Sequence, residues 1–275
     1  MPKKAVLTEY SLSVPKIKKP LTLALVSDIH ERKCNDILEL LKESKPDLIL
    51  IAGDTFERFD NEKNKPCHKN SMRLPRRVFL TTAFYVNYNL MRIFGKKNMP
   101  QTANAYEFLR ESSKLVPMFM SLGNHEEKLL EDDISLLRDN GIFLLDNADV
   151  CAAIHDERIY IGGLSNEPDE KWLEEFARKP GFKLLLCHHP NYYDSFVAGK
   201  DIDLTLAGHN HGGQFKLFGK GVLSSRSGLF PKYDSGVFYN RLVVSAGCSN
   251  TVALPRWGNP RELVLIYLKP DTIIK

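Results

Sequence analysis

The chain has 275 residues, of which 43% are hydrophobic and 26% are charged. This length and balance allow a large buried core in one globular domain, and they argue against a disordered chain. The net charge of +4 is too small to indicate nucleic-acid binding without a local basic surface.

The hydrophobic pattern predicts alternating strands and helices over the first three quarters of the chain. Apolar runs predict strands at 21–27, 47–52, 116–122, 142–145, 159–161, 182–187 and 203–206, and helices at 36–44, 127–139 and 172–178. Residues 214–268 are richer in glycine and β-forming residues, which indicates strands and loops. Strand–helix alternation followed by a β-rich part predicts an α/β fold with two sheets and helices outside them.

One segment, residues 58–102, departs from this alternation. It is polar and basic at first, and residues 78–94 are apolar and aromatic. A transmembrane span is disfavoured, because a span needs ~20 mostly apolar residues and would put Asp54 and Asn124 on opposite sides of a bilayer. Two interpretations stay open. The segment is either an inserted helix that packs on the domain, or a lid that meets a lipid-like substrate or an anionic membrane through residues 73–97.

The cysteines and the N-terminus bear on where the protein works. Five cysteines lie far apart without a Cys-x-x-Cys pair, which favours reduced thiols over a disulfide framework or a zinc ribbon. The N-terminal residues hold no continuous apolar stretch of the kind that a signal peptide needs, because Glu9 and the lysines between Lys16 and Lys19 interrupt it. We therefore expect a cytoplasmic protein, with peripheral contact to the inner membrane face as an extension.

Two histidines come directly after the apolar run at 203–206. His209 and His211 are two residues apart and lie between glycines. In an extended segment, residues i and i+2 point the same way, so this spacing predicts that both imidazoles aim at one spot. Imidazole is the commonest neutral metal ligand near pH 7, which makes the pair a candidate metal site once other ligands are found.

Four further clusters of metal-competent side chains also follow predicted strands. In open α/β sheets ligands bind at the carboxyl ends of the strands, so we expect all these loops to meet at one rim. Mixed oxygen and nitrogen donors without a thiolate suit Mn²⁺, iron or Zn²⁺ in a catalytic site. So many ligands suit two ions about 3.5–4 Å apart that share one carboxylate. The candidate ligands are Asp28, His30, Asp54, Asn124, His188, His209 and His211.

Each of these residues also has an ordinary structural interpretation. Asp28 and Asp54 suit helix N-caps, and Asn124 suits a turn. Arg256 suits either a contact with a substrate phosphate or a surface salt bridge, so it stays outside the ligand set. We prefer the metal site because the structural interpretations would all have to hold at once.

Five short motifs in the chain point to one family. They are Asp28-x-His30, Gly53-Asp54-x-x-Glu57, Gly123-Asn124-His125-Glu126, His188-x-Pro190 and Gly208-His209-x-His211. Together they resemble the signature blocks of calcineurin-like metallophosphoesterases, in that family's order, over nearly the whole chain apart from the insertion. The part from residue 208 to 263 is also similar to the YkuE/YaeI-like branch, some of whose members hydrolyse phospholipids or UDP-diacylglucosamine.

The resemblance implies a fold and an assignment of ligands. It implies a four-layer αββα sandwich of two mixed β-sheets flanked by helices, as a single domain over residues 1–275. It implies one ion held by Asp28, His30, Asp54 and His211, and a second held by Asp54, Asn124, His188 and His209, with Asp54 bridging. Beside these ligands, His125 is our candidate for protonating the leaving oxygen, and Glu57 has a supporting role.

These features predict a dinuclear metal-dependent phosphoesterase that cleaves a phosphodiester, pyrophosphate or phosphomonoester bond. We expect attack by a hydroxide that bridges the ions, with Asp54 and His125 as catalytic residues. The insertion favours a lipid-linked substrate, and a soluble phosphodiester such as a cyclic nucleotide is the alternative. A non-catalytic scaffold of the same fold is disfavoured, because no ligand position is missing. Nucleic acid is not an expected partner, because the basic residues cluster mainly at 63–77 and no array of base-stacking aromatics is evident.

Overall fold

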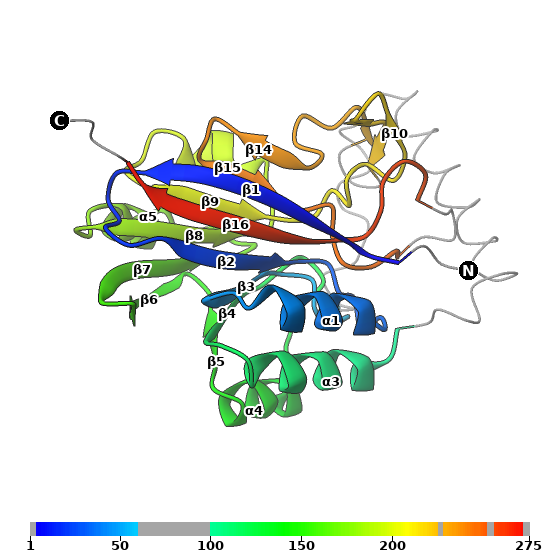
Figure 1. Ribbon diagram of the computed structural model, residues 1–275. Helices are drawn as coiled ribbons and strands as arrows, with labels where there is room; N and C mark the ends of the chain where they lie inside the picture. Colours follow the sequence, from blue (N-terminus) through cyan, green and yellow to red (C-terminus); the bar gives the residue numbers. More distant parts are fainter. Residues whose placement is uncertain (1–3, 60–99, 225–227, 252–255, 272–275) are drawn as a thin grey trace, which may run out of the picture.

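Two six-stranded sheets that pack face to face form the centre of the protein (Figure 1). A computed structural model describes residues 4–59, 100–224, 228–251 and 256–271. The first sheet contains, in spatial order, β1 (Val6–Val14), β16 (Glu262–Pro270), β2 (Leu21–Val26), β3 (Leu48–Ala52), β4 (Met118–Ser121) and β5 (Ile142–Leu145). The second contains β14 (Gly236–Phe238), β15 (Leu242–Val244), β9 (Leu204–Ala207), β8 (Phe182–Cys187), β7 (Glu157–Leu164) and β6 (Ala148–Ile154). Both sheets are mixed.

Helices cover the outer face of each sheet. The first sheet is covered by α1 (Asn35–Ser44), α3 (Thr102–Ser113) and α4 (Glu131–Asp139), and the second by α5 (Glu170–Ala177) and the single π-helical turn η2 (Tyr193–Val197). One apolar cluster fills the space between the sheets, and a further cluster joins each sheet to its helices. These four layers confirm the predicted α/β sandwich.

The central strands explain why the sequence predicts so much of this arrangement. Every residue of β3 and of β8 is buried. Both strands have a parallel neighbour on at least one side and a packed layer on each face, which requires a continuous apolar run. The runs at 47–52 and 182–187 meet that requirement, and the predicted strands there are confirmed.

Some elements differ from the prediction. The strands β1 and β6 and the helix α3 were not expected, and the helix predicted at 127–139 begins only at Glu131. The backbone before α4 does not form a helical turn, because the Glu127 N–H donates to the Arg58 carbonyl at 3.0 Å instead. Asp133 then accepts the N–H of Leu130 at 2.9 Å, which begins the helix there.

The two ends of the predicted insertion lie together on the domain. Arg58 and the hydroxyl of Thr102 are 3.5 Å apart, and both donate to the carboxylate of Glu31, at 2.6 and 2.8 Å. The interior of the insertion, including the proposed membrane contact at 73–97, lies outside the described residues. Among the described helices, none is long and apolar enough to cross a membrane. The four described cysteines form no disulfide with one another, and Cys67 lies outside the described residues.

Candidate metal centre

Five loops meet at one rim, and each leaves the carboxyl end of a strand. Three follow β2, β3 and β4 of the first sheet, and two follow β8 and β9 of the second. Backbone hydrogen bonds join neighbouring loops, from Asp28 N–H to the Gly53 carbonyl at 3.1 Å and from Gly208 N–H to the His188 carbonyl at 3.2 Å. The parallel central strands therefore bring side chains from distant parts of the sequence to one place.

Six of the predicted ligands fall into three overlapping groups. In each group the candidate ligand atoms lie within 4.8 Å of one another. The groups are Asp28 with His30 and His211, His30 with Asp54 and His125, and Asp54 with His188 and His209. Because His30 and Asp54 each belong to two groups, the three form one continuous cluster.

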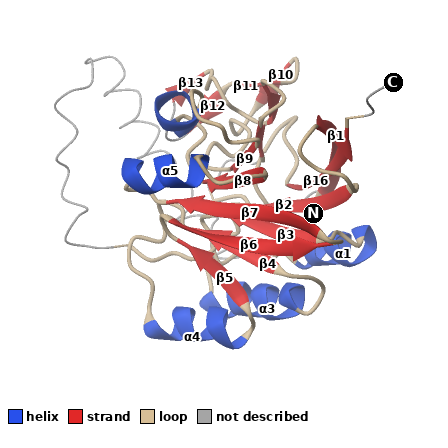
Figure 2. Cartoon of the chain, turned by 90° about the vertical axis from the view of Figure 1, so that its left-hand side faces the viewer, coloured by secondary structure: helices blue, strands red, loops and turns tan. Residues whose placement is uncertain are grey.

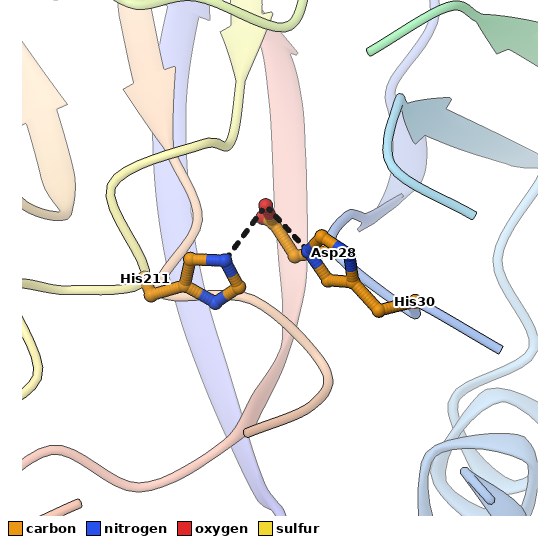
Figure 3. Close-up of side chains that lie close together, drawn as sticks. All are labelled: Asp28, His30 and His211. Carbon is orange, nitrogen blue, oxygen red and sulfur yellow. Dashed lines mark ion pairs between the residues drawn. The ribbon is translucent and has the colours of Figure 1, made fainter. Parts of the chain in front are cut away.

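Asp28 lies between two histidines at one end of this cluster (Figure 3). Its Oδ1 is 3.8 Å from Nε2 of His30 and 3.5 Å from Nε2 of His211. The backbone N–H of His209 donates to the same oxygen at 3.1 Å and fixes the carboxylate. Both imidazoles thus converge on one buried carboxylate, as ligands of a common ion would.

Asp54 occupies the middle of the cluster. Its Oδ2 is 3.1 Å from Nε2 of His188, 3.6 Å from Nε2 of His30 and 3.9 Å from Nε2 of His125. Its Oδ1 accepts the backbone N–H of His125 at 2.9 Å. The Nδ1–H of His188 donates to the Ala52 carbonyl at 2.7 Å, which leaves Nε2 of His188 as the ligand atom.

The expectation that His209 and His211 aim at one spot is wrong. It assumed an extended segment, but the strand β9 ends at Ala207 and the following residues turn. Both histidines have a left-handed backbone, with φ of 73° and 49°. His211 consequently approaches Asp28, whereas Nδ1 of His209 lies 3.2 Å from Nε2 of His188.

Left-handed backbone recurs in the other loops of the rim. Asp28, His30 and Asp54 have φ of 57°, 52° and 56°. Residues other than glycine rarely adopt this region, and such strain gathers at functional sites. None of these residues caps a described helix, because α1 follows Cys34 and the loop after Asp54 leads into no described helix. The N-cap interpretation of Asp28 and Asp54 is therefore wrong.

Two glycines allow the loops to approach this closely. A Cβ on Gly123 would overlap the Asp54 carboxylate, and a Cβ on Gly208 would lie 2.6 Å from Oδ2 of Asp28. Any larger residue at either position would displace a candidate ligand. The glycines of both motifs are thus explained by the space that the carboxylates need.

Buried polar atoms test whether the cluster fits metal ions. Both side-chain polar atoms of Asn124 and Nε2 of His30 are buried without a hydrogen-bond partner in the described part of the chain. Buried polar groups are normally satisfied, so Oδ1 of Asn124 and Nε2 of His30 point to a ligand that accepts a lone pair from each. An amide oxygen and an imidazole nitrogen are both donors to Mn²⁺, iron or Zn²⁺, and the residues therefore fit the implied group.

The charges within the protein also fit bound cations. Burial by itself would raise the pKa of Asp54, but the positive field of His188 and His30 outweighs it and holds that pKa well below its usual value. Burial would lower the pKa of His188, but Asp54 raises it to about 9. For His30 the neighbouring carboxylates of Asp28 and Glu57 likewise outweigh burial, and its pKa rises to about 10. The carboxylates therefore need positive charge beside them, which divalent cations also provide.

Glu57 joins two of the histidines from outside the cluster. Its Oε1 is 2.9 Å from Nδ1 of His30 and its Oε2 is 2.8 Å from Nδ1 of His125. Burial would raise the pKa of Glu57, but the hydrogen bonds from His125 and His30 lower it to about 2. An ionised Glu57 thus fixes the proton of each ring on Nδ1 and directs both Nε2 atoms at Asp54.

Replacing Glu57 should weaken metal binding without removing a ligand. Glu57→Gln replaces the charged carboxylate by a neutral amide, whose NH₂ group faces one of the two imidazoles as a donor. We therefore expect the Kd for Mn²⁺ to rise about 10–100-fold. Isothermal titration calorimetry measures this change. The control is Glu43→Gln on the exposed side of α1, which should leave Kd unchanged. Equal Kd values for both variants would exclude this role of Glu57.

Glu126 is a site residue whose role the sequence did not indicate. Its buried carboxylate accepts backbone N–H groups from Gly123 at 2.6 Å, Asp54 at 3.0 Å, Thr55 at 2.6 Å and Phe56 at 3.0 Å. It therefore ties the loop after β3 to the loop after β4 and sets the position of Asp54. The glutamate in the motif was visible, but its backbone partners were not.

Arg256 makes no surface salt bridge to the described residues. Its guanidinium donates to the carbonyls of Ala246 and Ser249, both at 2.6 Å, and its Nη2 lies 3.1 Å from Nδ1 of His211. Burial lowers the pKa of Arg256 to about 10. Arg256 thus holds the C-terminal loop against a candidate ligand. The alternative of a surface salt bridge is wrong, and contact with a substrate phosphate stays a prediction.

Comparison with known proteins identifies the family. A model of the calcineurin-like phosphoesterase family matches residues 21–213. The chain is 27% identical over 267 residues to the uncharacterized protein YpbG of Bacillus subtilis (strain 168), a match that covers 94% of this chain and 85% of YpbG. It is 24% identical over 210 residues to the uncharacterized metallophosphoesterase YkoQ of the same organism, covering 72% of this chain and 63% of YkoQ. Sulfate thiohydrolase SoxB from Thermus thermophilus is 14% identical with a TM-score of 0.47, covering 90% of this chain and 56% of SoxB.

The family match spans all five motifs and the strands that carry them. It covers well over half of the chain, from β2 to the loop after β9. The finer placement in the YkuE/YaeI-like branch stays a prediction. The chain belongs to the calcineurin-like phosphoesterase family of metal-dependent phosphoesterases.

Proposed function

We propose that the protein is a single-domain hydrolase of phosphate esters that works with two divalent cations. The observation that carries the proposal is the shared carboxylate of Asp54, whose Oδ2 lies 3.1 Å from His188 and 3.6 Å from His30. These histidines belong to different groups of candidate ligands. The first ion would be held by Asp28, His30, Asp54 and His211, and the second by Asp54, Asn124, His188 and His209.

The cations and the side chains would supply different parts of the chemistry. When bound, two such cations supply Lewis acidity toward phosphate oxygens and a hydroxide nucleophile at neutral pH. Asp54 would offset the repulsion between two positive charges, and Asn124 would offer a neutral oxygen ligand, which would leave its ion more acidic than a carboxylate would. His125 is oriented by Glu57 and directs Nε2 toward Asp54 at 3.9 Å. In this proposal His125 protonates the leaving oxygen.

We propose first the type of phosphate bond and then the class of substrate that carries it. The site suits a phosphodiester, pyrophosphate or phosphomonoester, because each presents oxygens to two cations and a leaving oxygen to His125. The apolar and aromatic sequence of residues 78–94 supports a lipid-linked ester. A soluble diester is the alternative. Location in the cytoplasm, on the inner membrane face, also remains a proposal.

Hydrolysis of two soluble aryl esters tests the proposal. Purified protein with Mn²⁺ should cleave bis(p-nitrophenyl) phosphate or p-nitrophenyl phosphate, and a chelator should stop the reaction. The variant His211→Ala, which removes a ligand of one ion, should lose most of this activity. A well-folded, Mn²⁺-loaded protein that cleaves neither these esters nor a phospholipid would favour the non-catalytic scaffold instead.

Thermal unfolding tests metal binding without an enzymatic assay. Cations bind only the folded cluster, so Mn²⁺ about a hundredfold above Kd should raise Tm by about 5–10 °C. The shift should disappear with a chelator and shrink in His211→Ala. A Tm that is the same with Mn²⁺ and with chelator would contradict the proposed metal centre.

A further inference from the structure

Large apolar side chains are exposed on two short hairpins beside the metal centre. The hairpins are β10 (Lys216–Leu217) with β11 (Lys220–Gly221), and β12 (Leu223–Ser224) with β13 (Gly228–Leu229). Phe218 at the first turn is 98% exposed, and Phe230 and Trp257 are both 68% exposed. We call this set the hairpin patch, and it consists of Leu217, Phe218, Leu229, Phe230 and Trp257.

Backbone hydrogen bonds hold the patch together as one surface. Lys216 N–H donates to the Trp257 carbonyl at 2.9 Å, and Val222 N–H donates to the Phe215 carbonyl at 2.7 Å. Phe230 N–H donates to the Val222 carbonyl at 2.9 Å. Figure 2 shows the four strands gathered at the end of the molecule opposite α3 and α4. The apolar side chains therefore belong to one region rather than to scattered positions.

Two lysines and one carboxylate lie at the first hairpin. Lys216 donates to the hydroxyl of Ser235, and Asp234 accepts the backbone N–H of Gly221 at 2.6 Å. Lys220 is exposed and pairs with Leu217 across the first hairpin. A cation thus stands beside the most exposed apolar side chains.

We propose that the hairpin patch docks on the surface of an anionic phospholipid bilayer. Phe218 and Trp257 would enter the interface, where aromatic side chains are favoured, while Lys220 reaches the headgroup phosphates. A second copy of the chain is the alternative occupant, and the light-scattering measurement below separates it from the bilayer.

Short stretches of chain join the patch to the metal centre. The first hairpin begins five residues after His211, and Trp257 follows Arg256, whose Nη2 lies 3.1 Å from Nδ1 of His211. In this proposal, docking would bring the rim of five loops toward the bilayer surface. If the proposed hydrolysis also holds, the substrate is a phosphate ester held in the bilayer surface. Only this assignment of the substrate class rests on the proposed function.

Co-sedimentation with vesicles tests the docking. The full chain should bind vesicles of phosphatidylglycerol and phosphatidylcholine, bind pure phosphatidylcholine more weakly, and lose affinity as salt rises. The double variant Leu217→Ser with Phe218→Ser should bind the anionic vesicles at least about tenfold more weakly. The control is Leu130→Ser, directly before α4, with Ile134→Ser on α4. It removes side chains of 51% and 47% exposure at the opposite end of the molecule (Figure 2) and should bind like the wild type.

Further outcomes separate docking from hydrolysis. The hairpin variant should keep wild-type turnover of a soluble aryl ester, because neither residue touches the metal centre. Vesicle binding that is equal in the hairpin and control variants overturns the docking proposal and leaves the hydrolase proposal standing. A wild-type dimer in light scattering that the hairpin variant dissociates, without any vesicle binding, also overturns it and assigns the patch to a second copy. Normal vesicle binding without hydrolysis of any ester overturns only the function.

Discussion

Asp54→Asn is expected to reduce kcat for a soluble aryl phosphodiester at least about a thousandfold, or about 4 kcal/mol of transition-state stabilisation. The carboxylate belongs to two of the three ligand groups, and its Oδ2 faces three imidazole nitrogens. An amide has nearly the same shape but carries no charge, so it cannot offset the repulsion between two cations. Steady-state kinetics in saturating Mn²⁺ measures the loss.

A matched variant separates this effect from general damage. Asp149→Asn removes the charge of another partly buried carboxylate, which lies on the edge strand β6 and forms an ion pair with Lys179. It should keep kcat near the wild-type value, and both variants should give the wild-type circular dichroism spectrum. If folded Asp54→Asn turns over like Asp149→Asn, Asp54 is not the shared ligand.

Glu126→Ala is expected to lower the free energy of unfolding by about 3–5 kcal/mol. The substitution leaves up to four buried backbone N–H groups without their acceptor. Because one of these groups belongs to Asp54, the loop that carries the shared carboxylate should also lose its position. Urea denaturation measures the stability, and the Kd for Mn²⁺ measures the effect on the site.

The neighbouring residue supplies the comparison for Glu126. Glu127 has an exposed side chain, and Glu127→Ala should change the free energy of unfolding by less than about 0.5 kcal/mol. Glu126→Gln should fall between the two, because its amide keeps one acceptor oxygen but turns a donor toward the N–H groups. A stability of Glu126→Ala within the error of Glu127→Ala would refute the scaffold role of Glu126.

The sequence predicts the central fold better than its edges. Central parallel strands need unbroken apolar runs, and β3 and β8 have them. The edge strand β1 alternates between exposed and buried residues, and its parallel partner β16 lies more than 250 residues away. The start of α4 depends on backbone bonds to Arg58, a residue about 70 positions earlier. Such pairings have no local signal in the sequence.

The sequence likewise predicts some features of the site and not others. Motifs at strand ends indicate which side chains gather at the rim, because strand ends in α/β sheets converge. They do not indicate backbone conformation, so the left-handed turns that separate His209 from His211 were missed. Nor do they reveal Glu126 or Arg256, whose partners are main-chain groups of other loops. The assignment of ligands to individual ions stays a prediction.

Anomalous diffraction from crystals soaked in Mn²⁺ tests the central claim most directly. The account predicts two manganese peaks about 3.5–4 Å apart, with the Asp54 carboxylate between them. Asp28, His30 and His211 should lie around one peak and Asn124, His188 and His209 around the other. A single peak, or peaks away from Asp54 in a saturated crystal, would contradict the shared-carboxylate centre.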